Sequence, residues 1–367
     1  MRHLKYIFVL FLLCAGCRQE SPKEITLLQF NIWQEGTMIE GGFASIVNHI
    51  ARLQPDFVTF SEVRNYNDTD FIARLIDALS EAGVTYYGER SVSTGIISKY
   101  PILKQEIIYP LQNDRGSVLK ACFRVEGREV VVYSAHLDWL NCSSYLPRGY
   151  GSSDWKKLPQ PVTDIDSLLA DNRASFRDDE IRALLSDALK EQDKIVLIGG
   201  DFNEPSHLDW QADTKNIRDH RNVVIEWDCS ALLYSNGFVD AFREKHPNAV
   251  DYPGFTFAAD NPAAKLDQLV WSPDADDRER IDFIYYRSDN TIALKDMRIV
   301  GPSGSVLRGE RAPDSGKDTF IEPMGIWPSD HKALLATFIL LPKSSGQHSA
   351  SFSLHDENLF PSLMVVR

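Results

Sequence analysis

The feature that most constrains this chain is a set of apolar runs rich in β-branched residues, each ending in a polar side chain that can do chemistry. The clearest is IVLIGGDFNEP, in which Ile195 and three more apolar residues lead through two glycines to Asp201 and Asn203. Such runs favour β-strands. A single Asp or Asn after a strand is commonly a turn residue. Six such strand ends in one chain instead predict a sheet that brings polar groups together.

The strand-like runs alternate with segments of helical periodicity, which predicts an α/β fold. Apolar residues recur at helical spacing from Phe43 to Leu53, from Phe71 to Leu79 and from Ile181 to Leu189. The chain has 367 residues and 43% hydrophobic content, enough for one large domain, which we place at residues 25–341. The strand-like runs are EITLLQFNIW, DFVTFSEV, TGIISKYPIL, SVLKACFRV, EVVVYSAHLDW, KIVLIGGDFN, ERIDFIYYR and KALLATFILL.

Three long polar stretches interrupt this pattern, at residues 141–164, 258–279 and about 301–328. Long loops inside a compact domain are usually functional or disordered. The first stretch contains Trp155 and two tyrosines, which favours an ordered loop. It follows directly after a strand end with polar side chains, so we expect it to border the site.

The polar residues at the strand ends form one chemically coherent set. Each lies beside residues that should be buried, and buried charges need a partner or a metal ion. The two asparagines in the set can hydrogen-bond phosphate oxygens without adding negative charge. In chain order the set is Asn31, Glu62, His136, Asp138, Asp201, Asn203, Asp282, Asp330 and His331.

This set predicts metal-assisted acid–base chemistry. Glu62 and Asp330 supply hard oxygen ligands suited to Mg²⁺ (or Mn²⁺), which takes few protein carboxylates. His136 and His331 titrate near neutral pH, and Asp282 can orient one of them. The sequence has no glycine-rich phosphate loop with its lysine and no H-E-x-x-H motif, so neither a P-loop nucleotide hydrolase nor a zinc protease is indicated.

In their order, the motifs QFNIW, SEV, SKYP, SAHLDW, GGDFNEP, GFTF, RIDFIYY and SDH resemble those of the endonuclease/exonuclease/phosphatase superfamily. The resemblance covers residues 27–338, and "GGDFN" with "SDH" is its most specific part. It implies a DNase-I-like four-layer sandwich, in which two packed mixed β-sheets are flanked by helices. It also implies Mg²⁺-dependent hydrolysis of a phosphoester, with Glu62 as the main metal ligand and Asn31 and Asp330 beside the metal.

The same resemblance implies catalytic roles for five residues. His331 corresponds to the general base, paired with Asp282. Asp201 corresponds to the group that orients the attacking water, or to the base itself. His136 and Asn203 would contact the scissile phosphate.

Two further residues are candidates for substrate binding. Asp138 follows His136 by two positions and would share its face of the strand. Arg173 either faces the phosphate or lies on the surface of a helix, and the sequence favours neither alternative. Arg177, further along the same segment, is interpreted as helix surface.

The remaining histidines and cysteines show no catalytic pattern. His207 and His220 are interpreted as surface residues. Cys122 lies in a strand-like run and is expected in the core. Cys142 and Cys229 lie in loop-like contexts and could form a disulfide in an oxidising compartment.

The N-terminus predicts export rather than a part of the fold. Residues 1–16 have a basic start and a short apolar run, which is typical of a secretory signal, and the run is too short to span a bilayer. Cys17 follows in CAGC, which resembles a bacterial lipoprotein box, so we expect a lipid on Cys17 and a tether over residues 17–24. The alternative is an ordinary cleaved signal. Residues 342–367 are expected to form a linker and tail.

Together these features predict a monomeric, Mg²⁺-dependent phosphoesterase of the bacterial cell envelope, held to the membrane by its lipid anchor. A secreted endonuclease or exonuclease acting on DNA or RNA, and an inactive binding protein with the same fold, are the alternatives. The net charge of −13 argues against passive coating of nucleic acid, which needs Lys and Arg to displace counterions. It leaves nucleic acid open as a substrate, because a bound cation dominates its local field. The substrate, and whether it is a diester or a monoester, stay open.

Overall fold

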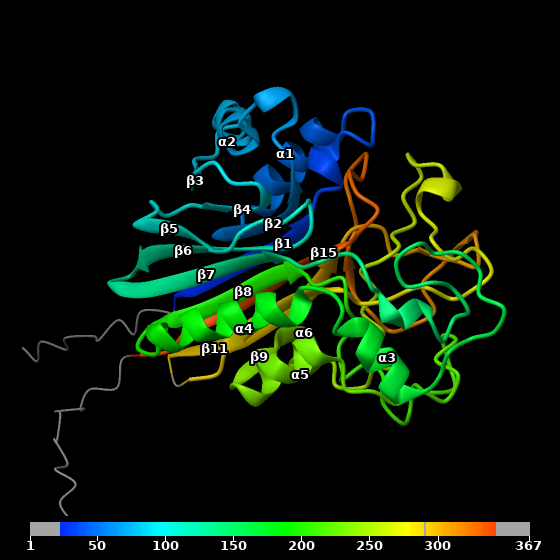
Figure 1. Ribbon diagram of the computed structural model, residues 1–367. Helices are drawn as coiled ribbons and strands as arrows, with labels where there is room; N and C mark the ends of the chain where they lie inside the picture. The colour runs from blue at the N-terminus through cyan, green and yellow to red at the C-terminus, as the bar shows by residue number, and fades with distance from the viewer. Residues whose placement is uncertain (1–22, 290, 343–367) are drawn as a thin grey trace, which may run out of the picture.

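The computed structural model describes residues 23–289 and 291–342, which form two packed β-sheets flanked by helices (Figure 1). The strands are β1 (Glu24–Asn31), β2 (Phe57–Val63), β3 (Tyr87–Gly88), β4 (Ser93–Ser98), β5 (Lys104–Tyr109), β6 (Ser117–Val125), β7 (Arg128–His136), β8 (Ile195–Asp201), β9 (Phe238–Asp240), β10 (Asp282–Arg287), β11 (Ile292–Val300), β12 (Ser305–Leu307), β13 (Glu310–Ala312), β14 (Phe320–Ile321) and β15 (Ala333–Leu340). One sheet has the order β14-β11-β15-β1-β2-β4-β3 and the other β5-β6-β7-β8-β10-β9. Both are mixed, since β1–β2 and β7–β8 are parallel while β1–β15 and β6–β7 are antiparallel.

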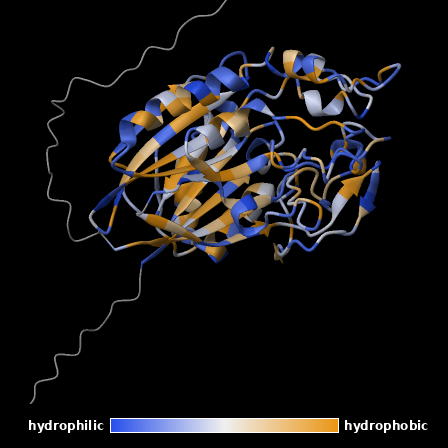
Figure 2. Cartoon of the chain, turned by 90° about the horizontal axis from the view of Figure 1, so that it is seen from below, coloured by the Kyte–Doolittle hydropathy of each residue, from blue (hydrophilic) through white to orange (hydrophobic). Residues whose placement is uncertain are grey.

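Helices cover the outer face of each sheet and complete the four layers. They are α1 (Gly42–Leu53), α2 (Phe71–Glu81), α3 (Ile165–Asn172), α4 (Arg177–Ala188), α5 (Asp228–Ser235) and α6 (Ala241–Lys245). Helices α1 and α2 pack residues such as Ile46 and Leu75 on the first sheet. Helix α4 packs Leu184 on the second sheet, together with α5. In Figure 2 the strands in the middle are mainly apolar, while the helices outside carry both polar and apolar residues.

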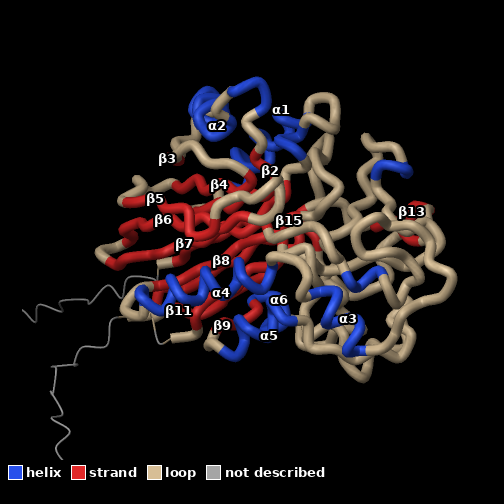
Figure 3. Tube along the Cα trace, viewed as in Figure 1, coloured by secondary structure: helices blue, strands red, loops and turns tan. Residues whose placement is uncertain are grey.

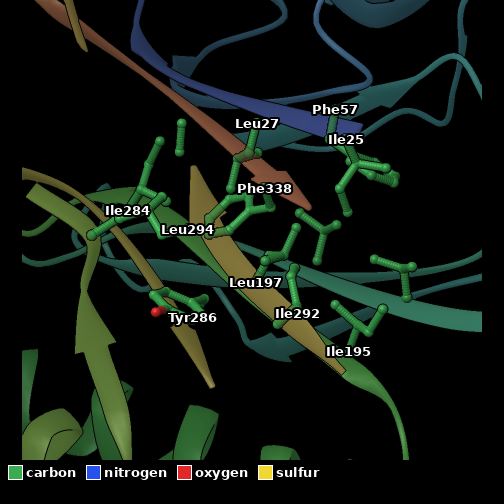
Figure 4. Close-up of a cluster of buried hydrophobic side chains, with 14 of the residues drawn as sticks. Ile25, Leu27, Phe57, Ile195, Leu197, Ile284, Tyr286, Ile292, Leu294 and Phe338 are labelled. Carbon is green, nitrogen blue, oxygen red and sulfur yellow. The ribbon is translucent and has the colours of Figure 1, made fainter. Parts of the chain in front are cut away.

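The main core lies between the two sheets, where side chains from both inner faces meet (Figure 4). Because side chains alternate along a strand, Ile25 and Leu27 of β1 face this core while Leu28 faces the helices. Ile195 and Leu197 of β8 do the same from the opposite sheet. Further along both strands the inward positions become polar, so the space between the sheets changes from apolar to polar toward one end.

Long loops gather at that polar end of the sandwich (Figure 3). They include residues 137–164, 202–227 and 246–281, which contain only short helices or turns. Strands β1, β2, β7 and β8 end at this side and β10 and β15 begin there, so the terminal residues of these strands lie beneath the loops.

The fold class predicted from the sequence is correct, and the three predicted helical segments correspond to α1, α2 and α4. The sequence left open whether Cys142 and Cys229 form a disulfide, and in the structure both are free thiols. None of the helices that the structure describes is long and apolar enough to cross a membrane. The predicted signal, the lipidated Cys17 and residues 343–367 lie outside the described residues.

Candidate active site

The polar end of the space between the sheets begins with β1. Gln29 and Asn31 continue the inward face of Ile25 and Leu27, and both are fully buried. The inward face of β1 is therefore apolar at its start, at Ile25 and Leu27, and bears two amide side chains at its end. The amide of Gln29 lies 3.4 Å from Asp282 and 3.3 Å from Ser61, so it links the two sheets.

Three site residues form one row across the second sheet. His136 of β7 lies opposite Asp201 of β8, and Asp201 lies opposite Asp282 of β10. Strand register alone therefore brings together residues that are 146 positions apart in the sequence (136 and 282). All three are buried.

Asn31 connects this row to the first sheet. Its Nδ2 donates to Asp201 Oδ2 at 2.9 Å and lies 3.1 Å from Glu62 Oε1. Its Oδ1 accepts the backbone N–H of Trp33 at 2.9 Å, which fixes the orientation of the amide. Asn31 therefore holds two carboxylates from different sheets close together.

Glu62 points into the site because β2 is irregular there. The pairing of β2 with β4 slips between Ser61 and Val63, and Glu62 has a φ of +71°. A bulge of this kind re-aims a side chain at a strand end. Glu62 Oε2 then accepts the backbone N–H of Gln34 at 2.9 Å.

His331 and Asp282 form a close pair. His331 Nδ1 lies 2.8 Å from Asp282 Oδ2, and His331 Nε2 lies 3.9 Å from Asp201 Oδ2. Because a carboxylate accepts hydrogen bonds, Nδ1 carries the proton and Nε2 is directed toward Asp201. The ring of Phe257 packs 5.2 Å from the His331 ring.

We refer to Glu62, Asp201, Asp282, Asp330 and His331 as the acidic cluster. Burial, together with the charge of Asp282, raises the pKa of Asp201 to about 7. Burial and the charge of Glu62 raise the pKa of Asp330 to about 7 as well. Burial alone would lower the pKa of His331, but the negative charges of Asp282 and Asp201 reverse this and raise it well above the ordinary value.

The donor set fits a divalent cation. Asp201, Asp282 and His331 each offer a ligand atom, and these atoms lie within 4.8 Å of one another, although Asp282 and His331 are hydrogen-bonded to each other. Glu62 adds a further carboxylate, which the Nδ2 of Asn31 links to Asp201. Carboxylates with pKa values raised by burial and by each other are stabilised by a bound cation, because it offsets their repulsion.

His136 and Asn203 border the acidic cluster. His136 Nδ1 contacts Ser93 Oγ at 2.9 Å, and burial lowers the pKa of His136 to about 3, so its ring is neutral at pH 7. Asn203 donates from Nδ2 to the carbonyl of Leu137 at 3.0 Å. Ser93 was not predicted, because nothing in its strand-like context marks it until β4 is placed beside β7.

The two glycines before Asp201 each allow a close approach of backbone. A Cβ at Gly199 would lie 2.2 Å from Thr59 Oγ1 of the first sheet, and one at Gly200 would lie 2.5 Å from the carbonyl oxygen of Ala135 on the neighbouring strand β7. Both distances are shorter than real Cβ contacts. A larger residue at Gly199 would therefore push β8 and Asp201 away from the first sheet.

A cavity of about 450 Å³ opens above these residues. Its lining includes Glu62, His136, Asp201, Asn203, Asp330 and His331. The long loops supply the other side with Tyr145, Trp155, Asp267, Trp271, Asp277 and Glu279. Among the described lining residues there are seven carboxylates, two histidines and a single arginine, Arg64.

Two predicted substrate contacts do not reach this cavity. The carboxylate of Asp138 receives Arg115 Nε at 2.8 Å and the N–H of Phe176 at 2.9 Å, so it braces a loop. Arg173 pairs with Asp228 on the exposed surface, with Nε 2.8 Å from Oδ2. We correct both assignments, because these side chains are directed elsewhere.

Three residues interpreted as surface are buried instead. Arg177 is fully buried and donates to the carbonyls of Asp138 and Leu140, both at 2.7 Å. His220 stacks on Trp210 at 3.7 Å, and His207 is only 8% exposed. Arg177 and His220 contact loop residues, and His207 contacts Ser230 of α5, so all three depend on packing between distant segments that no periodic signal in the sequence could indicate.

A comparison with protein families agrees with this geometry. The sequence model described as the Endonuclease/Exonuclease/phosphatase family matches residues 28–331. The chain belongs to this family. It is therefore a phosphoric ester hydrolase of a family that generally depends on divalent metal ions.

An uncharacterized protein of Caenorhabditis elegans is 29% identical over 349 residues, which cover 92% of this chain and 98% of that protein. Among solved structures, D. rerio TDP2 complexed with a single-strand DNA product is 16% identical, with a TM-score of 0.46, over 86% of this chain and 98% of that chain. The human Nocturnin catalytic domain with bound sulfate is 14% identical, with a TM-score of 0.49, over 86% and 94%.

Proposed function

We propose that this protein is a Mg²⁺-dependent phosphoesterase that acts on a small phosphate ester. The observation that carries the proposal is the His331–Asp282 pair beside a set of buried oxygen ligands, at one end of a cavity of about 450 Å³. The family supports the reaction class, and the choice of Mg²⁺ rests on the hard oxygen ligands.

The residues that would hold the cation are Glu62, Asn31 and Asp330, with Asp201 next to them. When bound, Mg²⁺ would polarise the phosphate and offset the negative charge of these carboxylates. Asp201 and Asn31 are hydrogen-bonded to each other, so their positions are set before any ligand enters.

The protein's own groups would handle the proton of the attacking water. Asp282 holds the Nδ1–H of His331, and the charge of a bound cation would counter the carboxylates that raise the pKa of His331, which would leave Nε2 to accept that proton. Asp282 also stabilises the imidazolium that results. Asp201, 3.9 Å from His331 Nε2, would orient the water. His136 and Asn203 would contact the phosphate oxygens.

A nuclease for long nucleic acids is a less suitable alternative. Proteins that track a polymer use many Lys and Arg contacts to its phosphates. The described lining of this cavity offers Arg64 alone, against seven carboxylates.

A substrate panel tests this proposal. The panel is bis-p-nitrophenyl phosphate, p-nitrophenyl phosphate, and single-stranded and duplex DNA, each with Mg²⁺ or with excess EDTA. We expect metal-dependent turnover of at least one small ester and loss of that turnover in EDTA. Glu62→Gln should lose it too, while Arg173→Ala serves as the surface control. Full turnover in excess EDTA would refute the metal role, and DNA as the best substrate would favour the nuclease.

The location of the protein is a separate proposal, supported by the sequence of residues 1–17. We expect lipid on Cys17 and recovery of the protein in the membrane fraction of a bacterial host. Cys17→Ser should shift it to the soluble fraction. Recovery of the native protein only in the medium, with no fatty-acid label, would leave an ordinary cleaved signal.

A further inference from the structure

The cavity has a second wall that the proposed chemistry does not use. Trp139, Trp155 and Trp271 form this wall, which we name the tryptophan wall. The rings of Trp139 and Trp155 are nearly parallel, with centroids 6.0 Å apart at 9°. Trp155 and Trp271 follow at 4.6 Å and 36°. The wall joins two loops that are far apart in the sequence and that gather at the same end of the sandwich (Figure 3).

The wall is ordered but its outer rings are open to solvent. Trp139 is 37% exposed and Trp271 is 46% exposed, although both line the cavity. The indole N–H of Trp139 donates to the carbonyl of Asp114 at 3.1 Å, which fixes that ring. Large aromatic surface left exposed and held in place is typical of a binding site rather than of a core.

Trp155 is held at a cost to folding. Its φ is +50°, in the left-handed region that a bulky residue rarely adopts. Its indole N–H is buried with no acceptor among the described residues. Stability alone does not explain a tryptophan here, and such costs persist mainly at functional positions.

We propose that the tryptophan wall binds a planar aromatic group of the substrate, such as a nucleobase, next to the phosphate held at the acidic cluster. This inference rests on the proposed function and names its substrate class as a small ester with one flat ring system. Aromatic faces stack on such rings without reading their edges. The cavity volume of about 450 Å³ suits one such molecule and not a polymer.

The arrangement of the rings favours a flat group over a quaternary ammonium group. Ammonium groups bind in cages whose aromatic faces surround them. Here two of the three indole rings are nearly parallel, and Tyr145 presents an edge contact to Trp155 at 86°. Because the three indoles pack on one another, the aromatic faces left free are those of the exposed rings, Trp139 and Trp271, and the rings do not enclose a cage.

Binding to a protein that cannot turn over tests this inference directly. The probes are AMP, ribose 5-phosphate and phosphocholine, added with Mg²⁺ to the His331→Ala protein and followed by tryptophan fluorescence. We expect AMP to bind about 5- to 150-fold more tightly than ribose 5-phosphate, the range for stacking one base on an aromatic side chain. Trp271→Leu should remove most of this preference, and Trp271→Phe should retain most of it. Tyr87→Ala, an exposed aromatic away from the cavity, is the matched control.

Equal affinity for AMP and ribose 5-phosphate would overturn the inference, and so would tighter binding of phosphocholine. The two proposals fail separately. If the wild-type protein hydrolyses no ester but AMP still binds preferentially through Trp271, the proposed reaction is wrong and the aromatic subsite stands. If esters are hydrolysed with no preference for an aromatic group, the subsite is wrong and the reaction stands.

Discussion

The acidic cluster can be compared with a second group of buried charges, the paired cluster of Asp209, Asp240, Arg243 and Arg280. In the paired cluster two carboxylates meet two guanidinium groups. Arg280 lies 2.8 Å from Asp209 and 2.7 Å from Asp240. Although burial opposes it, the charges of Arg243 and Arg280 lower the pKa of Asp209.

The acidic cluster also lies in the interior, but its negative side chains are not matched by positive ones. Two of its carboxylates, Asp201 and Asp330, have raised pKa values, and His331 is its one member that can be positive. Arg280 is two residues from Asp282 in the sequence, yet it pairs with the other cluster. The comparison teaches that buried charge stabilises the fold where its partners are built in. Where buried carboxylates lack positively charged side chains as partners, they form a site that can bind a cation and, with it, a phosphate.

The largest expected effect is the loss of turnover when His331 is replaced. We predict that His331→Ala lowers kcat by about 10²- to 10⁴-fold, because general-base assistance contributes about that much. Asp282→Asn should cost less, since part of the geometry remains. The double variant should be far from additive, because the two residues act as a unit. Steady-state kinetics with a thermal-melting control measures this, and a His331→Ala enzyme within a few-fold of wild type would move the base role to Asp201.

The second largest expected effect is a loss of protein stability when a carboxylate of the paired cluster is replaced. Asp209→Asn leaves Arg243 and Arg280 without their shared carboxylate, so we expect a loss of about 3–5 kcal/mol in the free energy of unfolding. Turnover per folded molecule at low temperature should change little. Urea unfolding measures the loss. If Asp209→Asn is as stable as wild type, the pairing is not what holds this region.

In the acidic cluster, neutralising a carboxylate is predicted to raise the free energy of unfolding at pH 7 and not to lower it. In metal-free protein the pKa of Asp330 is about 7, above the ordinary value of 3.8. The contribution of this carboxyl to the free energy of unfolding is therefore most favourable below about pH 4 and is lost as the pH rises toward 7. We expect Asp330→Asn to flatten the loss and to raise the stability at pH 7 by at most about 4 kcal/mol, since one pKa unit is about 1.4 kcal/mol.

Urea unfolding in EDTA at pH 4, 5.5 and 7 measures this difference, and the Asp330→Asn protein should also lose activity. A variant that is less stable than wild type at every pH would show that Asp330 acts as an ordinary structural residue.

The smallest effect is expected at the surface pair of Arg173 and Asp228. Exposed ion pairs contribute about 0–1 kcal/mol, and Arg173 lies away from the cavity. Arg173→Ala should leave both KM and the unfolding midpoint nearly unchanged. A clear rise in KM would restore Arg173 as a substrate contact and contradict our correction.

The sequence predicts the strands and their chemistry better than the loops and their contacts. Apolar alternation along β1 and β8 predicts the inner faces, and therefore the end at which Asn31 and Asp201 meet. Short elements such as α5 and the partly charged strand β11 give no comparable period. Arg177 was misassigned because its partners are loop carbonyls, which no spacing in the sequence reveals.

The residues of the candidate site also divide into those on strands, which could be predicted, and those that meet through loop packing, which could not. Residues at strand ends could be predicted because strand direction places them together. Ser93 reaches His136, and Trp271 reaches the cavity, only through the packing of distant segments. Gln29 could have been found, because it precedes Asn31 by two positions and shares its face of β1.

The direction of β1 also has a consequence for where this enzyme would look for its substrate. The strand begins at Glu24 and delivers Asn31 to the cavity about 23 Å away, at about 3.3 Å per residue. A chain attached through Cys17 would thus be tethered by the end of the sandwich opposite its mouth. The mouth would face away from the bilayer, and an enzyme anchored in this way would sample dissolved molecules of its compartment and not the lipids of the membrane.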